Sequence, residues 1–116
     1  MDKAQRKELM TRYRQNRPEA GVYRIVNERS NRALLGSSPN LPSVRSKLEF
    51  ARSTNTPSAL DFRLHADARA FGASAFRFEV LEVLEVASDA TDAQLADDLQ
   101  ALEALWRERQ DPTLMY

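Results

Sequence analysis

The chain has 116 residues, of which 42% are hydrophobic and 29% are charged, and its formal net charge at pH 7 is zero. This composition is typical of a folded globular domain and excludes an intrinsically disordered chain. The absence of cysteine excludes disulfides and thiolate metal sites. Because there is no apolar leader and no apolar run long enough to cross a bilayer, we expect a cytoplasmic protein that does not associate with membranes.

The charged residues are unevenly distributed along the chain. Residues 1–52 contain 12 basic and 5 acidic side chains, a net charge of +7, and residues 53–116 contain 5 basic and 12 acidic side chains, a net charge of −7. The basic half could present a positive face to the phosphates of a nucleic acid. Alternatively, the two halves could neutralise each other across the fold.

A helix is predicted over residues 2–16, because Asp2 can cap it and apolar residues recur at helical spacing behind it. Pro18 ends this helix, since proline disfavours helical geometry in the residue before it. The basic side chains of the helix could contact phosphates, or the helix could be an accessory element packed against the rest of the domain.

A β-hairpin follows the first helix. The β-branched and aromatic run from Val22 to Val26 predicts a strand, residues 27–31 are polar and turn-forming, and Ala33 to Leu35 predict a second strand that Gly36 ends. Gly21 and Gly36 would lie near each other at the open end of the hairpin. A ligand could approach the bare backbone closely there.

Four further elements are predicted: helices over residues 42–52, 58–71 and 92–109, and a strand over residues 76–86. Pro42 suits the first turn of its helix, Gly72 is a C-terminal stop, and Thr91 is a candidate N-cap. Glutamates recur every three residues between 79 and 85, which also fits a helix, but the β-branched and aromatic content favours a strand.

These elements predict an α/β (α+β) fold, in which a small three-stranded antiparallel sheet is flanked by helices within a single domain over residues 1–116. The strands are expected at residues 21–27, 32–36 and 76–86, with the last strand joining the sheet of the hairpin.

Several short passages resemble those of the GIY-YIG nuclease family. Gly21-Val22-Tyr23, followed by Leu34-Leu35-Gly36 and two serines, is similar to the two-part signature that gives the family its name. Downstream, residues 72–82 resemble a passage with Phe-x-Phe followed by Leu-Glu, and residues 102–106 resemble a Glu-x-x-Trp element. The leading helix is similar to that of some bacterial members.

The resemblance implies a metal-dependent endonuclease that acts on nucleic acid, with DNA as the expected substrate and Mg²⁺ or Mn²⁺ as the cofactor. It implies catalytic roles for Tyr23, Arg45 and Glu103, metal binding by Glu103, and substrate contacts by Gly36, Ser37 and Lys47. Glu103 lies at the edge of an apolar helical stripe, where a carboxylate needs a partner. That partner could be a divalent ion, or a cation such as Arg45 or Lys47.

The chain also departs from the family pattern, so the active site is incomplete. Leu34 stands in place of the second tyrosine, and Arg45 falls about one position late on its helix. The expected histidine has no match, with Asn55 or Ala59 nearest, and the terminal asparagine is missing. The only histidine, His65, is interpreted as a surface or packed residue.

Two functions therefore stay open at this point. One is a weak or impaired nuclease, in which replacing Leu34 by tyrosine is expected to increase cleavage. The other is a catalytically inactive module on the nuclease fold that binds nucleic acid or a protein partner.

Overall fold

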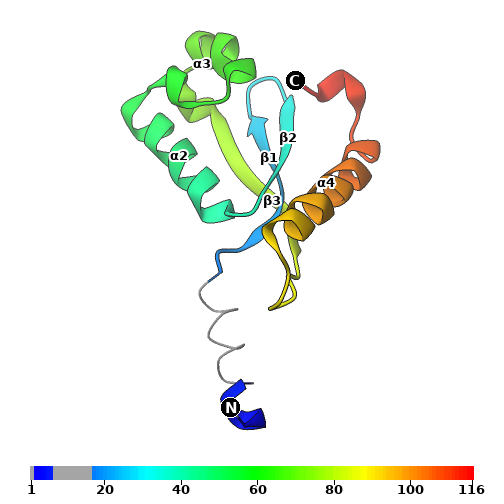
Figure 1. Ribbon diagram of the computed structural model, residues 1–116. Helices are drawn as coiled ribbons and strands as arrows, with labels where there is room; N and C mark the ends of the chain where they lie inside the picture. The colour runs from blue at the N-terminus through cyan, green and yellow to red at the C-terminus, as the bar shows by residue number, and fades with distance from the viewer. Residues whose placement is uncertain (1, 7–16) are drawn as a thin grey trace.

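Three antiparallel strands form a sheet that lies between two helical layers (Figure 1). The structure is a computed structural model that describes residues 2–6 and 17–116. The strands are β1 (Ala20–Asn27), β2 (Ala33–Ser38) and β3 (Phe76–Leu84), in the order β2-β1-β3. Helices α2 and α3 lie on one side of the sheet and α4 on the other. This arrangement confirms the predicted α+β class.

The β1–β2 hairpin closes through the side chain of Asn27. Its carboxamide oxygen accepts a hydrogen bond from the backbone N–H of Arg29 at 2.9 Å, and its backbone carbonyl accepts one from Asn31 at 2.8 Å. Asn31 has a φ of 65°, a conformation that asparagine tolerates better than most residues. The polar composition of this stretch therefore predicted the turn correctly.

Strand β3 pairs with β1 along its length, from Phe76 opposite Asn27 to Leu84 opposite Ala20. A register shift lies between Val22 and Tyr23. The strand ends at Leu84, two residues before the predicted end. The strand prediction was right despite the three-residue spacing of glutamates, since pairing with a central strand favours aromatic and β-branched residues.

Helices α2 (Leu41–Thr54) and α4 (Asp92–Glu108) match the predictions to within two residues at each end. The side chain of Asn40 caps α2 by accepting from the backbone of Ser43 at 3.1 Å. Thr91 caps α4 in a reciprocal capping box with Gln94. Both caps satisfy backbone N–H groups that would otherwise have no partner at a helix start.

The predicted helix over residues 58–71 is wrong in its first half. The segment forms two short 3-10 turns, Pro57–Ala59 and Phe62–Leu64, before α3 (His65–Phe71) begins. The carboxylate of Asp61 accepts from the backbone N–H of Arg63 at 2.9 Å and so starts a new turn inside the expected helix. Side chains of this kind compete with helical hydrogen bonds.

The apolar side chains form two clusters, one on each side of the sheet. The cluster under α2 and α3 comprises Ile25, Leu34, Leu48, Ala51, Leu60, Leu64, Ala68, Ala73 and Phe76. The cluster under α4 comprises Ala20, Leu95 and Leu99. Within the described ranges, no helix combines the length and the apolar character needed to cross a membrane.

The start of the predicted first helix is present. Residues 3–6 are helical, and the carboxylate of Asp2 accepts from the backbone N–H of Gln5 at 2.8 Å, as expected of an N-cap. The remainder of that prediction, residues 7–16, lies outside the described residues.

A buried polar cluster fastens the last residue to the hairpin. The Tyr116 hydroxyl donates to Asp67 at 2.6 Å and accepts from the carboxamide of Asn27, which is fully buried, at 2.9 Å. The guanidinium carbon of Arg32 lies 4.2 Å from the centre of the Tyr116 ring. Burial raises the pKa of Tyr116, and the hydrogen bond to Asp67 raises it further.

We expect Tyr116→Phe to lower the free energy of unfolding by about 1–2 kcal/mol, because the buried carboxamide of Asn27 loses an acceptor. Urea denaturation at neutral pH measures this loss. Since the pKa of Tyr116 is raised in the folded state, the contribution of the hydroxyl is fully present at neutral pH and is lost as the pH rises beyond the ordinary phenol value. A stability difference that grew with pH in this alkaline range would contradict the assignment.

Candidate functional site

Tyr23 lies directly across Gly36, its partner in the β1–β2 register. A Cβ atom on Gly36 would lie 2.6 Å from the Tyr23 hydroxyl oxygen and 2.7 Å from Cζ, closer than real side chains approach. Residue 36 must therefore be glycine while the tyrosine ring keeps this position. Tyr23 and Gly36, which come from the two separate parts of the signature, are thus in direct contact.

A second aromatic ring holds Tyr23 from the other side. Phe78 of β3 stacks on the Tyr23 ring with the ring centres 5.5 Å apart and the planes at 26°. The guanidinium carbon of Arg45, from α2, lies 5.1 Å from the centre of the Phe78 ring. Arg45 is therefore placed one aromatic ring away from Tyr23, although its position in the sequence is late relative to the family pattern.

The electrostatic environment keeps the Tyr23 phenol protonated. Burial raises the pKa of Tyr23, and the nearby carboxylates of Asp61 and Glu103 raise it further, while Arg63 opposes them. A phenol with a raised pKa is a poor general base at neutral pH and keeps the proton that a hydrogen-bond donor needs.

Glu103 has a protein partner in its own helix. Its carboxylate accepts from the Arg107 guanidinium at 3.1 Å, and its side chain is 28% exposed. The partner is thus neither of the two cations considered from the sequence, Arg45 and Lys47. The position at the edge of the buried stripe of α4 was predicted correctly.

The described parts of the chain contain no group of three or more histidine, cysteine, aspartate or glutamate side chains that could hold a metal ion. Two carboxylates, Asp61 and Glu103, act on the Tyr23 phenol, and Asp61 is paired with Arg63. Such a set fits a Mg²⁺ ion that keeps most of its water ligands, because Mg²⁺ dehydrates reluctantly and often binds proteins through one or two carboxylates.

Two of the predicted substrate contacts point elsewhere. Ser37 is opposite Val22, one residue from the Tyr23–Gly36 pair, so strand alternation sends its side chain to the opposite face of the sheet. Lys47 is exposed and lies two residues after Arg45, which turns it about 200° around the helix axis. The structure therefore brings Arg45, and not Lys47, to the Phe78 ring that stacks on Tyr23.

Leu34 occupies the core. It is paired with Ile25, is only 4% exposed, and belongs to the cluster under α2 and α3. Because Ile25 and Tyr23 are two residues apart on one strand, Leu34 shares the Tyr23 face and is its diagonal neighbour. The position is thus suited by geometry to a second side chain beside Tyr23, but its present residue contributes packing alone.

None of the residues considered for the missing histidine supplies a free imidazole or an equivalent. Asn55 adopts a φ of 50° at the end of α2, and its carboxamide oxygen accepts from the backbone of Ala73 at 3.1 Å. Ala59 packs against the core. The Nε2 atom of His65 lies 2.7 Å from the carbonyl oxygen of Leu60, which agrees with its interpretation as a packed residue.

The sequence analysis missed Asp61, Arg63 and Phe78 as members of this site. Phe78 lies in the passage over residues 72–82 that resembles the family. Because Phe76 and Phe78 are two positions apart on one strand, their rings are expected on the same face. Asp61 and Arg63 were assigned to a continuous helix. An aspartate two residues before an arginine, just after a leucine, is a local capping signal that would have broken that helix earlier.

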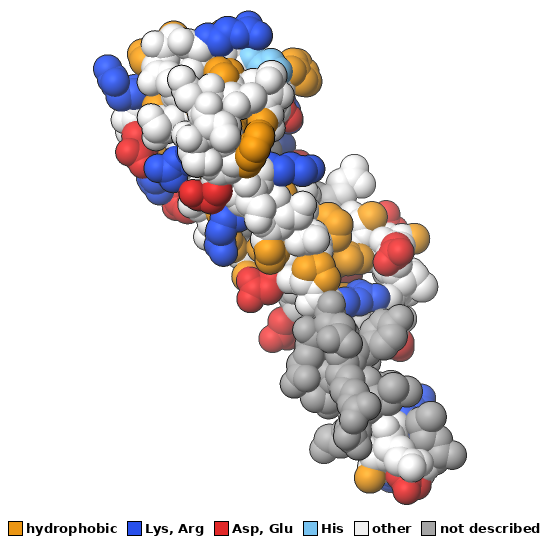
Figure 2. Space-filling view, turned by 90° about the vertical axis from the view of Figure 1, so that its left-hand side faces the viewer, with side chains coloured by type: hydrophobic (Ala, Val, Ile, Leu, Met, Phe, Trp, Pro, Cys, Tyr) orange, Lys and Arg blue, Asp and Glu red, His pale blue; other side chains and the backbone are white. Residues whose placement is uncertain are grey.

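The basic half of the chain is partly neutralised by the acidic half. Arg24 pairs with Glu79 at 3.0 Å, and Arg32 lies 3.8 Å from Asp67. Figure 2 shows the side of the molecule formed by α2 and α3, where lysine and arginine side chains are spread among acidic and apolar ones. At these pairs the two halves of the chain neutralise each other, while the side formed by α2 and α3 carries cations, carboxylates and apolar side chains together.

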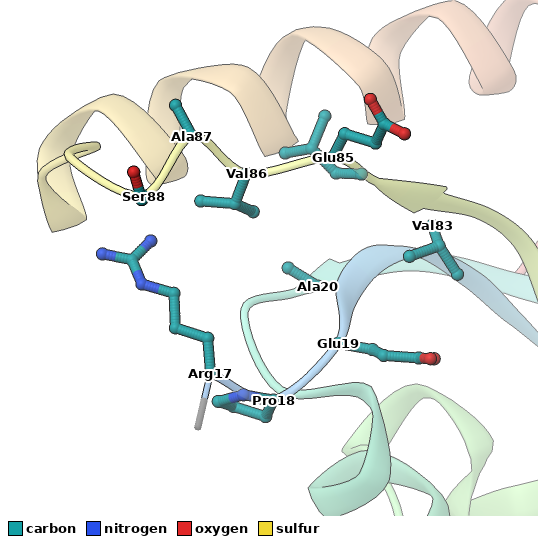
Figure 3. Close-up of a pocket in the computed structure, with 10 residues that line it drawn as sticks. Arg17, Pro18, Glu19, Ala20, Val83, Glu85, Val86, Ala87 and Ser88 are labelled. Atoms are coloured by element: carbon teal, nitrogen blue, oxygen red, sulfur yellow. The ribbon is translucent and has the colours of Figure 1, made fainter. Parts of the chain in front are cut away.

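A separate hollow of about 590 Å³ lies where the start of β1 meets the end of β3. Residues 17–20 and 83–88 line it, and Figure 3 shows the Arg17 side chain reaching towards Ser88. One nitrogen of this guanidinium donates to the carbonyl oxygen of Ala90 at 2.7 Å. The hollow contains none of the residues that the sequence marks as functional.

Comparison with known proteins adds a likeness of fold. No protein-family model matches the sequence, and no curated protein matches it. The structure is similar to the catalytic domain of the intron endonuclease I-TevI, solved as a point mutant, with a TM-score of 0.46 and 15% sequence identity over 72% of this chain and 84% of that one. The resemblance to the GIY-YIG family therefore depends on the short sequence motifs alone.

We expect Gly36→Ala to lower the free energy of unfolding by roughly 1–3 kcal/mol, because the added methyl group must displace the Tyr23 ring. In a Tyr23→Ala background the same substitution should cost much less, since the ring is gone. Denaturation of the wild type, both single variants and the double variant completes the cycle. Equal costs in both backgrounds would show that Gly36 is required for another reason.

Proposed function

We propose that this chain is a GIY-YIG-type nuclease domain that acts weakly on nucleic-acid phosphodiesters with a divalent metal ion. The proposal is supported by the contact of Tyr23 with Gly36 and Phe78 and by the Arg45 guanidinium that lies over the Phe78 ring. The charge of Glu103 adds to the raised pKa of the same phenol. In this proposal Tyr23, Arg45 and Glu103 act together as a hydrogen-bond donor, a cation and a carboxylate. Phosphodiester hydrolysis requires groups of these three kinds.

Each side chain then has a defined task. The protonated Tyr23 phenol donates a hydrogen bond to a non-bridging phosphate oxygen. The Arg45 guanidinium neutralises the phosphate charge, and its planar donors suit the phosphate geometry. Gly36 leaves the backbone bare, so the substrate can come close to the phenol.

In this proposal the Glu103 carboxylate is the protein ligand of the metal ion. A divalent ion bound there would supply a Lewis acid for the phosphate and a more acidic water. The Glu103 carboxylate is already paired with Arg107, so a bound ion must compete with that guanidinium. We therefore expect metal binding to be weak.

A second function, a binding module without cleavage, is favoured by two observations. Leu34 fills the core where the family has a tyrosine, and Glu103 is already bonded to Arg107. In this alternative the site binds a nucleic acid or a protein partner through Arg45 and the surrounding aromatic rings. The following experiments separate the two functions.

We expect Glu103→Gln to abolish any metal-dependent cleavage of DNA and to remove the rise in melting temperature that Mg²⁺ or Mn²⁺ produces in the parent protein. A ligand that binds only the folded state stabilises it, so the loss of the metal ligand removes the shift. Glu108→Gln is the matched control, since Glu108 lies five residues further along α4, on a different face of the helix, and is exposed. Equal melting shifts in the parent and in Glu103→Gln would make Glu103 a structural residue only.

We expect Leu34→Tyr to increase metal-dependent cleavage by roughly tenfold to a thousandfold, on the scale of one positioned hydrogen-bond donor. Leu34→Phe is the control, because it introduces the same ring without the hydroxyl. Both variants enlarge a buried side chain and should lose about 1–3 kcal/mol of stability. If neither the parent nor a folded Leu34→Tyr protein cuts DNA or RNA with Mg²⁺ or Mn²⁺, the binding module is the correct function.

A further inference from the structure

The side chain of Phe62 is strongly exposed beside the candidate site. It is 77% exposed, more than any other large hydrophobic residue in the described part of the chain. Apolar rings of this size are normally packed, so one that is left open in a structured segment is a candidate contact for a ligand.

Phe62 is held in place by its two neighbours. The Arg63 guanidinium forms a two-pronged ion pair with the carboxylate of Asp61, with Nε–Oδ1 and Nη2–Oδ2 distances of 2.9 and 3.0 Å. The same carboxylate accepts from the Arg63 backbone N–H at 2.9 Å. Three hydrogen bonds between Asp61 and Arg63 therefore fix the backbone turn that carries the ring.

The same turn also joins the ring to the candidate site. The guanidinium carbon of Arg63 lies 5.9 Å from the centre of the Phe62 ring. Leu60 and Leu64, two residues to either side of Phe62, belong to the core cluster against which Tyr23 and Phe78 pack. In agreement with this placement, the Asp61 carboxylate raises the pKa of Tyr23 and the Arg63 guanidinium lowers it. An open aromatic face thus lies on the turn that packs in the same cluster as the group that we propose to contact a phosphate.

The charges around the ring are mixed. Arg63 and Arg45 face this region as cations, whereas Asp61 and Glu103 are the carboxylates. Asp61 is neutralised by Arg63, and Glu103 by Arg107. Arg45 is then the cation whose described contact is an aromatic ring rather than a carboxylate, and it can serve a phosphate.

From this juxtaposition we infer that the site takes single-stranded nucleic acid, with an unpaired base stacked on Phe62 and the adjoining phosphate at Tyr23 and Arg45. The inference rests on the proposed function and narrows its substrate class. Stacking on an aromatic side chain requires a base face that duplex DNA does not offer, and it tolerates any base. In a duplex each face is covered by the neighbouring base pair.

The test measures binding without cleavage. Fluorescence anisotropy with a fluorescein-labelled oligo(dT) strand, in EDTA, should show that Phe62→Ala weakens binding by at least about fivefold, on the scale of one lost stacking contact. Phe62→Trp should retain binding. Binding of a hairpin duplex of equal length should be the same in all three proteins.

Phe71→Ala is the matched control. Phe71 is also an exposed phenylalanine beneath an arginine, with the Arg29 guanidinium carbon 5.5 Å from its ring centre, but it lies near the β1–β2 turn instead of near Tyr23. Its removal should leave oligo(dT) binding unchanged.

Three results overturn the inference: no effect of Phe62→Ala on oligo(dT) binding, an equal loss on strand and duplex, or no binding of either nucleic acid. The last result assigns the Phe62 surface to a protein partner. The cleavage assays of Glu103→Gln and Leu34→Tyr test the proposed function separately. Phe62-dependent strand binding without cleavage therefore supports this inference while selecting the binding module.

Discussion

The contact between Tyr23 and Gly36 is the constraint on which the site depends. Because the tyrosine ring lies where a side chain on residue 36 would be, the β1–β2 register and the glycine are fixed together. That register places Leu34 opposite Ile25, in the core. The same ring stacks on Phe78, which brings Arg45 of α2 towards the phenol. One aromatic side chain thus links both neighbouring strands and a helix.

The segment between α2 and α3 shows how a polar side chain can override an apolar pattern. Leu60, Leu64 and Ala68 have helical spacing, and all three are buried as that spacing predicts. The backbone between them is nevertheless not one helix, because the Asp61 carboxylate forms local hydrogen bonds with Arg63. The interruption exposes Phe62 and places two charges near Tyr23, so a local competition for hydrogen bonds shapes the candidate site.

The charge asymmetry of the sequence has a mixed outcome in three dimensions. Basic residues of the first half that lie on the sheet, such as Arg24, are paired with acidic residues of β3. Arg45 lies instead over an aromatic ring, where a cation gains from the ring quadrupole and stays available to an anion. A net charge of zero therefore conceals two environments for the basic residues, which are either paired with carboxylates or lie over aromatic rings.

The sequence by itself determined the three strands, their antiparallel pairing and the Thr91 cap of α4. These features depend on alternation, turn chemistry and capping, which act over a few residues. It also determined that Leu34 cannot supply a hydroxyl. The partner of Glu103, the break before α3, the face of Ser37 and the position of Phe62 were decided only by the tertiary structure. These four features depend on which of several nearby groups forms the hydrogen bond or ion pair, or on strand register. The spacing of residues along the sequence does not determine either of these.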